Sequence, residues 1–402
     1  MFQNELPQNN IKILKKIPAL IKKTFPIPER YKKELPSDIA ELSRLLTKKR
    51  GERSLSYLSR PNFLNAYLYY FLPWNLYRLC LLLPNLNITL SPGGIITDLG
   101  CGPLTFTAAL WISLPETRNI PLEINCIDRS GPALEAGKKF FTALCETENN
   151  NVNWKINLIK DDIDLRKTNM ASSARNTANI KKNTRASLVC AVNLYNEIYE
   201  NLSHNNTEGL RWIAVNAAGF MHNQAAENAF ILTVEPGVPQ SGRFISFLRD
   251  SLIELNRPPA SPCTHTSPCP LSPGTQINNN KKRWCHFAYK IANIPKELND
   301  LSLSAGLPKE RLTFSFLLAG RAETPQKSGQ TEKARIISDA FTLPDNQFGC
   351  YGCSAKGLIL LKSDKHSKEN LSSGDLVTPI FDKNGQRDKK SGALTAYLAG
   401  EK

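Results

Sequence analysis

The first ninety residues carry apolar side chains at helical spacing. Leu42 and Leu45 recur at helical intervals, and the aromatic run in residues 62–83 continues the pattern. We expect these aromatic side chains to pack in a core. The sequence therefore predicts a helical N-terminal region over residues 37–90, preceded by a basic, proline-punctuated arm over residues 1–36.

From residue 93 the pattern changes to short aliphatic or β-branched runs that alternate with helical segments. The runs predict strands at residues 94–98, 122–127, 156–159, 186–192 and 230–234, with helices at 105–114 and 133–147. Strands that alternate with helices imply a mostly parallel sheet covered on both faces. The sequence therefore predicts an α/β core over residues 91–256.

The last third of the chain has a different sequence pattern. Residues 257–320 hold three cysteines among proline turns and complete the core, and residues 336–402 carry short β-like runs, such as residues 357–361, that predict a small β module. Polar stretches predict loops at residues 167–185, 272–282 and 322–335.

Composition adds an electrostatic expectation. The chain has 402 residues, enough for two or three folded units, and a net charge of +15. Residues 1–53 contain 13 Lys or Arg against 6 Asp or Glu. Such an excess indicates an anionic partner, either nucleic acid or an anionic membrane surface, and a merely solvated face is the alternative.

No apolar stretch reaches the roughly 20 residues that a membrane span needs. The most apolar segment, residues 67–83, is interrupted by Pro73, Asn75 and Arg78. Residues 11–25 form a lysine-rich amphipathic stretch without the apolar region of a signal peptide. A mitochondrial presequence fits poorly because its first arginine would be Arg30. We therefore expect a cytoplasmic monomer, with the mitochondrial matrix as the alternative location.

A glycine loop carries the first candidate chemistry. The sequence DLGCGPLT at residues 98–105 follows a predicted strand and opens a predicted helix, as a nucleotide-binding loop requires. Gly100 and Gly102 let the backbone turn sharply and approach a ligand. Asp128, at the end of the next strand, is placed to accept hydrogen bonds from both hydroxyls of a ribose.

This loop resembles motif I of the Rossmann-like methyltransferases that use S-adenosylmethionine. The resemblance implies that Asp98, Gly100 and Gly102 surround the methionine part of the cofactor. It also implies an adenine contact from one of the two acids after the third strand, Asp162 in preference to Asp161.

Three cysteines form the second candidate site. Cys263 and Cys269 lie in PCTHTSPCPL at residues 262–271, and Cys285 lies in WCHF at residues 284–287. Thiolates gathered by proline turns indicate an iron–sulfur or metal site. Zinc held with His265 or His286, or by thiolates alone, is the alternative, and buried free thiols are a third interpretation.

Together these motifs resemble the mitochondrial small-ribosomal-subunit methyltransferase-like family and its bacterial relatives. EPG at residues 235–237, the two cysteine motifs, YLSRP at 57–61 and AYLYYFLP at 66–73 carry the resemblance over residues 50–320. It implies a [4Fe–4S] cluster and an action on or with the small ribosomal subunit and its rRNA. The fourth cluster ligand is then Cys353, in preference to Cys350.

The implied fold is a Rossmann-like methyltransferase domain with a helical N-terminal region, a cysteine-rich metal-binding insertion and a small β module. The sequence departs from the family at Leu104, where glycine is usual and where leucine is expected to crowd the cofactor. No Asn-Pro-Pro-Tyr motif for methylation of a base amine follows the fourth strand, and Asn193, Asn196 and Glu197 end it instead. Contact with a substrate base and helix capping are the two interpretations of these residues, so no catalytic residue is predicted. An rRNA methyltransferase, a non-catalytic assembly factor and a redox or zinc enzyme unrelated to RNA are the competing hypotheses.

Overall fold

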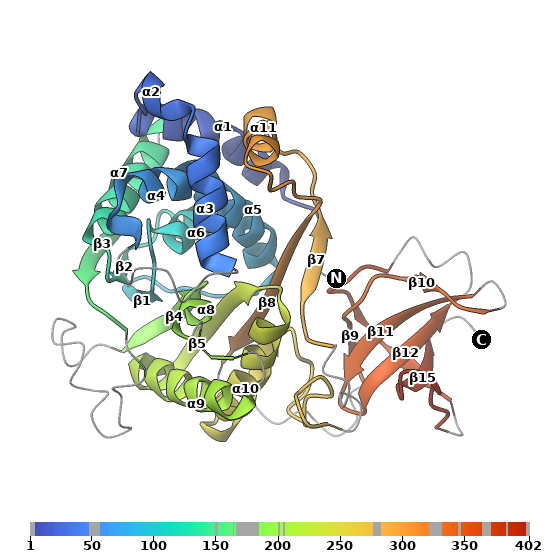
Figure 1. The fold of residues 1–402 in the computed structure, drawn as a ribbon. Helices are drawn as coiled ribbons and strands as arrows, with labels where there is room; N and C mark the ends of the chain where they lie inside the picture. Colours follow the sequence, from blue (N-terminus) through green and yellow to red (C-terminus); the bar gives the residue numbers. More distant parts are fainter. Residues whose placement is uncertain are drawn as a thin grey trace.

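The computed structural model describes residues 5–47, 57–148, 152–163, 165, 185–199, 202–203, 206–275, 283–320, 332–344, 347–363, 371–382 and 385–398. These residues form one large sheet surrounded by helices and a second, smaller unit built on its own sheet (Figure 1).

The large sheet has the strand order β3-β2-β1-β4-β5-β8-β6, and β7 also pairs with β8. β1 to β5 run parallel, whereas β8 runs antiparallel to β5. The strands are β1 (Gly94–Leu99), β2 (Leu122–Asp128), β3 (Trp154–Lys160), β4 (Ala186–Val192), β5 (Ala225–Pro236), β6 (Pro259–Ser261), β7 (Phe287–Lys290) and β8 (Arg311–Ala319). All five predicted strands are confirmed, and β6 to β8 were not predicted.

Helices cover both faces of this sheet. α5, α6 and α7 cover one face, α1 and α3 pack on the helices of that layer, and α9 and α10 cover the other face. Along β4, Cys190 faces the first layer while Val189 and Ala191 face the second, as the two-residue period of a strand requires. The parallel sheet is therefore apolar on both sides, which explains why its strands read as nearly continuous apolar runs.

The helices are α1 (Gln8–Thr24), α2 (Glu29–Lys32), α3 (Leu35–Thr47), α4 (Pro61–Ala66), α5 (Leu72–Leu82), α6 (Thr105–Ser113), α7 (Gly131–Thr147), α8 (Tyr195–Ile198), α9 (Thr207–Gln224), α10 (Pro239–Glu254) and α11 (Lys296–Ser304). α6 and α7 confirm two predictions. The helix expected at residues 62–83 is confirmed, but it is not a regular α-helix throughout, because a π-helical turn at Tyr67–Phe71 lies between α4 and α5. None of the helices in the described ranges is long and apolar enough to cross a membrane.

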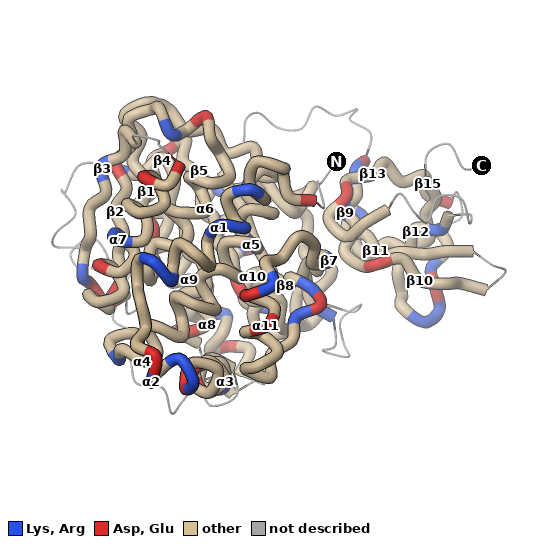
Figure 2. Tube along the Cα trace, turned by 90° about the horizontal axis from the view of Figure 1, so that it is seen from above, with Lys and Arg blue, Asp and Glu red and all other residues tan. Residues whose placement is uncertain are grey.

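The segment predicted as a basic arm is mostly helix α1. Leu14 and Ile17 are fully buried against the rest of the helical layer, whereas Lys12 and Lys15 are exposed. The lysines thus occupy the solvent side of a packed amphipathic helix. Lys16 forms an ion pair with Glu148, at 2.7 Å. Figure 2 shows Lys and Arg distributed over the molecule, with Asp and Glu among them.

The C-terminal unit is a second, smaller sheet with the order β13-β9-β11-β12-β15-β14, and β10 pairs with β11. Its strands are β9 (Ala334–Ile336), β10 (Phe341–Thr342), β11 (Phe348–Ser354), β12 (Gly357–Ser363), β13 (Leu376–Val377), β14 (Pro379–Phe381) and β15 (Leu394–Leu398). β12 confirms the predicted run at residues 357–361. Of the three predicted loops, residues 166–184, 276–282 and 321–331 lie outside the described residues.

Candidate functional site

A crevice opens at the carboxyl ends of β1 and β4, where the strand order reverses. β2 and β3 continue the sheet on one side of β1, and β4 and β5 continue it on the other. Ligands of open α/β sheets bind at such a switch point. A cavity of about 310 Å³ lies here, and Tyr57, Tyr67 and Asn75 from the N-terminal region close its other side. That volume suits a small-molecule ligand.

The glycine loop forms one wall of this cavity. Gly100 and Gly102 have φ values of +63° and +53°, and both line the cavity. A Cβ on Gly100 would lie 2.6 Å from a methyl carbon of Leu194, and the positive φ would strain any side chain there. Leu104 also has a positive φ, but its side chain is fully buried and packs towards Gly137 of α7. The expectation that Leu104 crowds the cofactor is therefore wrong.

Asp128 ties the end of β2 to the glycine loop. Its Oδ2 accepts a hydrogen bond from the backbone N–H of Gly102 at 2.9 Å, and its Oδ1 accepts one from Ser130 at 2.8 Å. Burial raises the pKa of the Asp128 carboxyl, and these two N–H donors oppose that rise. Each carboxylate oxygen can accept a further hydrogen bond, so the pair remains able to receive two donors from a diol.

The two acids after β3 also line the cavity, and they differ in their hydrogen bonds and exposure. The Oδ1 of Asp161 accepts a hydrogen bond from the backbone N–H of Asp162 at 2.8 Å, and the Asp161 N–H donates to the carbonyl of Asp128. Asp162 is exposed. The structure thus gathers Gly100, Gly102, Asp128 and Asp162 around one cavity, and the adenine contact stays a prediction.

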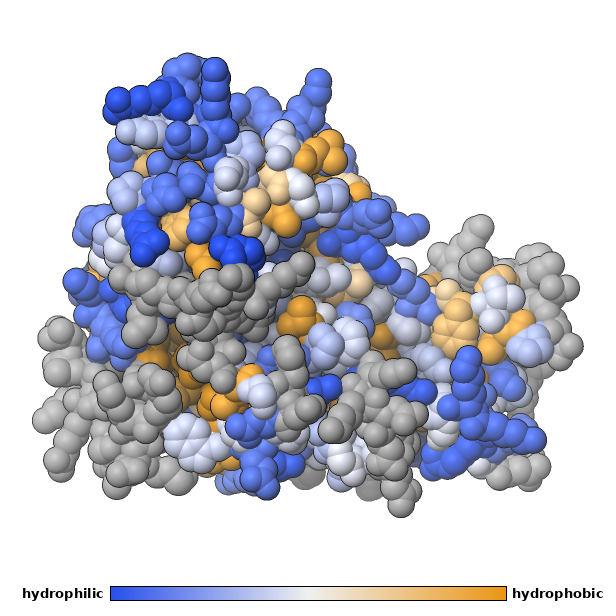
Figure 3. Space-filling model, viewed as in Figure 1, coloured by the Kyte–Doolittle hydropathy of each residue, from blue (hydrophilic) through white to orange (hydrophobic). Residues whose placement is uncertain are grey.

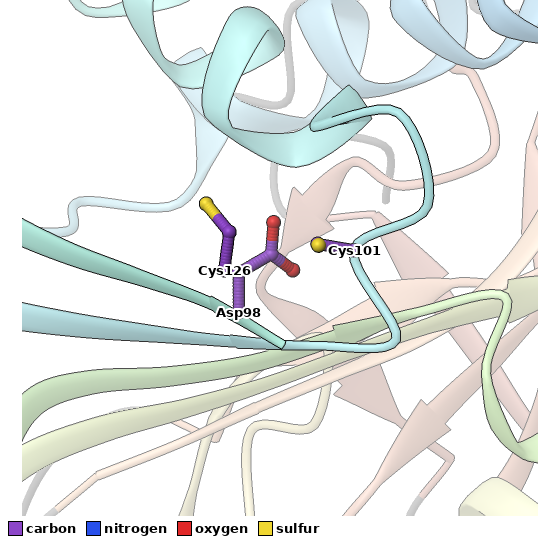
Figure 4. Close-up of side chains that lie close together, drawn as sticks. All are labelled: Asp98, Cys101 and Cys126. Atoms are coloured by element: carbon purple, nitrogen blue, oxygen red, sulfur yellow. The ribbon is translucent and has the colours of Figure 1, made fainter. Parts of the chain in front are cut away.

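Asp98 lies at the floor of the loop, in a group that the sequence analysis did not predict. In Figure 4 its carboxylate lies between the sulfur atoms of Cys101 and Cys126, and the ligand atoms of all three lie within 4.8 Å of one another. Cys190 donates to Asp98 Oδ1 at 3.5 Å, while Oδ2 has no hydrogen-bond partner in the part of the chain that the structure describes. Burial raises the pKa of Asp98 to about 8. Asp98 and Cys126 lie opposite each other on the parallel strands β1 and β2, and this pairing is the feature from which their contact could have been predicted.

Most polar residues after β4 form hydrogen bonds or ion pairs with other protein groups. Glu235 accepts hydrogen bonds from the backbone N–H groups of Tyr195 and Asn196, at 2.9 and 3.0 Å, and so holds the start of α8. Glu197 pairs with Arg129 at 3.0 Å and accepts a hydrogen bond from the hydroxyl of Tyr57. Of the three residues singled out after this strand, Asn193 alone has a buried side-chain oxygen that receives no hydrogen bond from the described residues.

The four predicted cysteine ligands come together from separate segments. Burial raises the pKa of the Cys353 thiol, and the charges of Cys269, Cys263 and Cys285 raise it further. The same mutual effect links Cys285 with Cys263 and Cys269, and Cys263 with Cys269. The guanidinium of Arg249 opposes these shifts and also donates to the carbonyls of His265 and Ser267, at 2.8 and 2.7 Å.

Two neighbouring candidates are placed differently. Cys350 lies on the same strand, β11, but packs in the core of the small sheet, and the charge that affects its pKa is that of Asp375. Residues three apart on a strand point to opposite faces, which separates Cys350 from Cys353. Nε2 of His265 lies 3.4 Å from the Cys353 sulfur, whereas His286 stacks on Trp284.

The strand order, the glycine loop and the carboxylate at the end of β2 define a Rossmann-like methyltransferase fold. The family described as mitochondrial small ribosomal subunit Rsm22 matches residues 92–358, and the chain belongs to this family. A search of curated proteins finds no match.

Several solved structures show a distant likeness. A methyltransferase from Geobacter sulfurreducens in complex with S-adenosyl-L-homocysteine is 12% identical, with a TM-score of 0.31, covering 62% of this chain and 91% of that chain. A class I S-adenosylmethionine-dependent methyltransferase from Listeria monocytogenes is 8% identical, with a TM-score of 0.31, covering 80% and 90%. TrmN from Thermus thermophilus is 9% identical, with a TM-score of 0.31, covering 62% and 52%. The fold assignment rests on the strand order, not on these similarities.

Proposed function

We propose that the chain binds S-adenosylmethionine in the cavity at β1 and β4 and acts on small-subunit ribosomal RNA during ribosome assembly. The observation that carries the proposal is the cavity itself, walled by Gly100, Gly102 and Asp128 at the switch point of a chain of the Rsm22 family. The cofactor supplies a methyl group on a sulfonium. The chain orients the cofactor. Asp128 would bind the ribose, the glycine loop would surround the methionine part, and Asp162 would contact the adenine.

Methyl transfer to pre-ribosomal particles tests this proposal. Isothermal titration should show one S-adenosylmethionine site per chain. Tritium from the labelled cofactor should then enter the rRNA of immature small subunits but not that of mature ones. Absence of cofactor binding would overturn the proposal.

A non-catalytic assembly factor is the second candidate, and one observation favours it. The polar side chains after β4, where a catalytic group would stand, are largely held by other protein groups, as with Asn196 and Glu235 or Glu197 and Arg129. Cofactor binding without tritium transfer, together with retained binding to immature particles, would support this candidate over the enzyme.

We further propose that Cys263, Cys269, Cys285 and Cys353 hold a structural [4Fe–4S] cluster. Four thiols are the usual ligands of such a cluster. Around a single zinc ion, with Zn–S bonds of about 2.3 Å, tetrahedral geometry would bring the sulfurs to about 3.8 Å from one another. Zinc held by the same four thiolates is the alternative, and metal content separates the two. Anaerobic purification with metal analysis should find about four iron atoms per chain, and stoichiometric zinc would contradict the assignment.

The charge of the chain supports an RNA partner. Its net charge is +15, and hydrophilic side chains cover much of the described part of the face shown in Figure 3. Binding to small-subunit rRNA should therefore weaken steeply with salt, because phosphate contacts release counterions. The family description names the mitochondrial small subunit, which supports the matrix as the compartment, and the cytoplasmic location stays a prediction.

A further inference from the structure

One side of helix α10 lies against the cysteine motifs. Gly242, Ser246 and Arg249 follow one another at intervals of four and three residues, so they lie on the same side of the helix. A Cβ on Gly242 would lie 3.0 Å from the carbonyl oxygen of Cys285, so the missing side chain leaves room for a close approach. The Ser246 hydroxyl lies 3.8 Å from the sulfur of Cys269. This side of α10 therefore forms a wall of the four-cysteine site.

Arg249 is the charged residue on this wall, and its side chain is only 2% exposed. Nη2 donates to the carbonyls of His265 and Ser267, at 2.8 and 2.7 Å. Nη1 donates to Oδ1 of Asp250 at 2.8 Å. Nε is buried too, and it donates to none of the residues that the structure describes. Because a buried N–H without an acceptor is costly, Nε needs an acceptor beyond these protein groups.

The two carbonyls that Arg249 binds belong to the turn between two of the cysteines. Both lie between Cys263 and Cys269 in the sequence, so one planar guanidinium holds the main chain of this turn at two points. Groups that bind around metal ligands in this way orient the ligands themselves. A side chain from a helix of the core thus fixes a loop whose two sulfurs must meet at one centre.

The positive charge of Arg249 also reaches all four cysteines. Burial raises the pKa of each of the four thiols, and the guanidinium lowers it in every case. A [4Fe–4S] core held by four thiolates carries a net negative charge, and this charge grows when the cluster takes up an electron. A charge removed from water needs an opposite charge or hydrogen bonds to compensate it. Arg249 offers both, because it is a buried cation with an N–H that is still free to donate.

We propose that Arg249 is a positioning residue of the four-cysteine site, which holds the turn between Cys263 and Cys269 and supplies the buried positive charge that offsets the thiolates of a bound cluster. The inference rests on the proposed cluster and adds a residue outside its ligand set. A cation beside the cluster stabilises the reduced, more negative form more than the oxidised form. Loss of the cation should therefore lower the reduction potential, and loss of the two carbonyl contacts should make the ligands less firmly held.

Two measurements on the anaerobically purified full chain test both roles: voltammetry gives the reduction potential, and transfer of iron to a chelator gives the rate of cluster loss. Arg249→Met should lower the ratio of reduced to oxidised cluster at a fixed potential at least about tenfold, which is about 59 mV for one electron, and should release iron several-fold faster. Arg249→Lys should keep most of the potential, because the charge remains, but should still release iron faster, because an ammonium lacks the planar fork. Arg211→Met is the matched control and should change neither, since it removes an exposed arginine that stacks on Phe247 of α10.

The outcomes separate failure of the cluster from failure of the inference. A wild-type chain that is purified without iron overturns the proposed cluster itself. An iron-loaded Arg249→Met chain with the potential of the control overturns the inference alone, even if it loses iron faster, because a merely structural contact would leave the potential unchanged. If the methionine variant holds no iron, Asp250→Asn decides. It removes the acidic partner of Arg249 and should raise the potential, by less because Asp250 is partly exposed, and an unchanged potential overturns the inference.

Discussion

At the scale of single residues, Asp98 shows how a buried carboxyl depends on what lies around it. It is fully buried, and among the described residues its carboxyl accepts a hydrogen bond from the weak donor Cys190 alone. Burial therefore raises its pKa to about 8, and the charge of Asp128 adds to the rise. At neutral pH this carboxyl holds its proton unless a cation is bound beside it.

Asp98→Asn should make the unfolding free energy less dependent on pH. The unfolded chain releases the Asp98 proton near pH 3.9, and the folded chain releases it only near pH 8. The contribution of the protonated Asp98 carboxyl to the unfolding free energy is complete below about pH 4. It is lost as the pH rises to about 8, and the unfolding free energy falls by at most about 1.4 kcal/mol per pH unit. The asparagine variant should lack this loss. Urea unfolding of both chains at several pH values in this window measures the difference, and parallel pH profiles would contradict the prediction.

Asp128→Asn should weaken cofactor binding, because an amide has one acceptor oxygen where the carboxylate has two. Either the N–H of Gly102 or that of Ser130 then loses its acceptor. We expect about a tenfold or larger loss in S-adenosylmethionine affinity, from that loss and from the poorer match to a ribose diol. Titration calorimetry measures it. The exposed Asp300 offers a matched control, and a variant at Asp128 that binds as tightly as Asp300→Asn would refute the assigned role.

At the scale of elements, the local pattern of apolar residues was sufficient to predict those helices and strands whose structure depends mainly on residues close in sequence. β1 to β5, α6 and α7 could be predicted because a parallel sheet buried on both faces leaves long apolar runs. The glycine loop and Asp128 could be predicted for the same reason, since they sit at the ends of such runs. The short strands β6 and β7 have too few residues to show a period.

Other features depend on tertiary contact and leave only faint traces in the sequence. Arg78 and Lys309 lie far apart in the chain and meet through the packing of α5 against the segment before β8. The sequence shows only that Asn75 and Arg78 are polar residues within an otherwise apolar helix. Within the π-helical turn, Tyr67 faces the pocket, and no periodicity argument predicts such a turn.

Strand β11 offers a matched pair of cysteines for testing the proposed cluster. Cys353 lies with the other three candidate ligands, and Cys350 packs on the opposite face of the strand. Cys353→Ser should therefore remove most of the iron and the visible absorption, while Cys350→Ser should keep both. Metal analysis after anaerobic purification measures the outcome. Equal iron content in the two variants would show that Cys353 is not a ligand.

At the scale of the whole molecule, the cysteine segment joins the two sheets. Cys269 and Leu271 pack with Leu358 and Leu360 of β12 in one apolar cluster. Hydrogen bonds cross the same boundary, among them those from Arg335 to the carbonyl of Pro262 at 2.9 Å, from Arg283 to that of Ser391 at 3.0 Å and from Thr264 to that of Lys333 at 3.2 Å. A cluster with ligands on both sides would lock this boundary, and its binding energy would be part of the folding energy.

Removal of the cluster should therefore loosen the C-terminal sheet without unfolding the core. Without the inorganic centre, four neighbouring thiols, that of Cys269 buried and the other three half-buried, must be accommodated at a boundary held by one small apolar cluster and a few hydrogen bonds. Hydrogen exchange should rise several-fold in β9, β11 and residues 262–271, because local opening costs less there, while β1 to β5 keep their protection. Mass spectrometry of the chain before and after anaerobic chelation measures this. Exchange that rises equally in β1 would mean that the cluster stabilises the whole chain, and unchanged exchange in β11 would mean that it stabilises neither sheet.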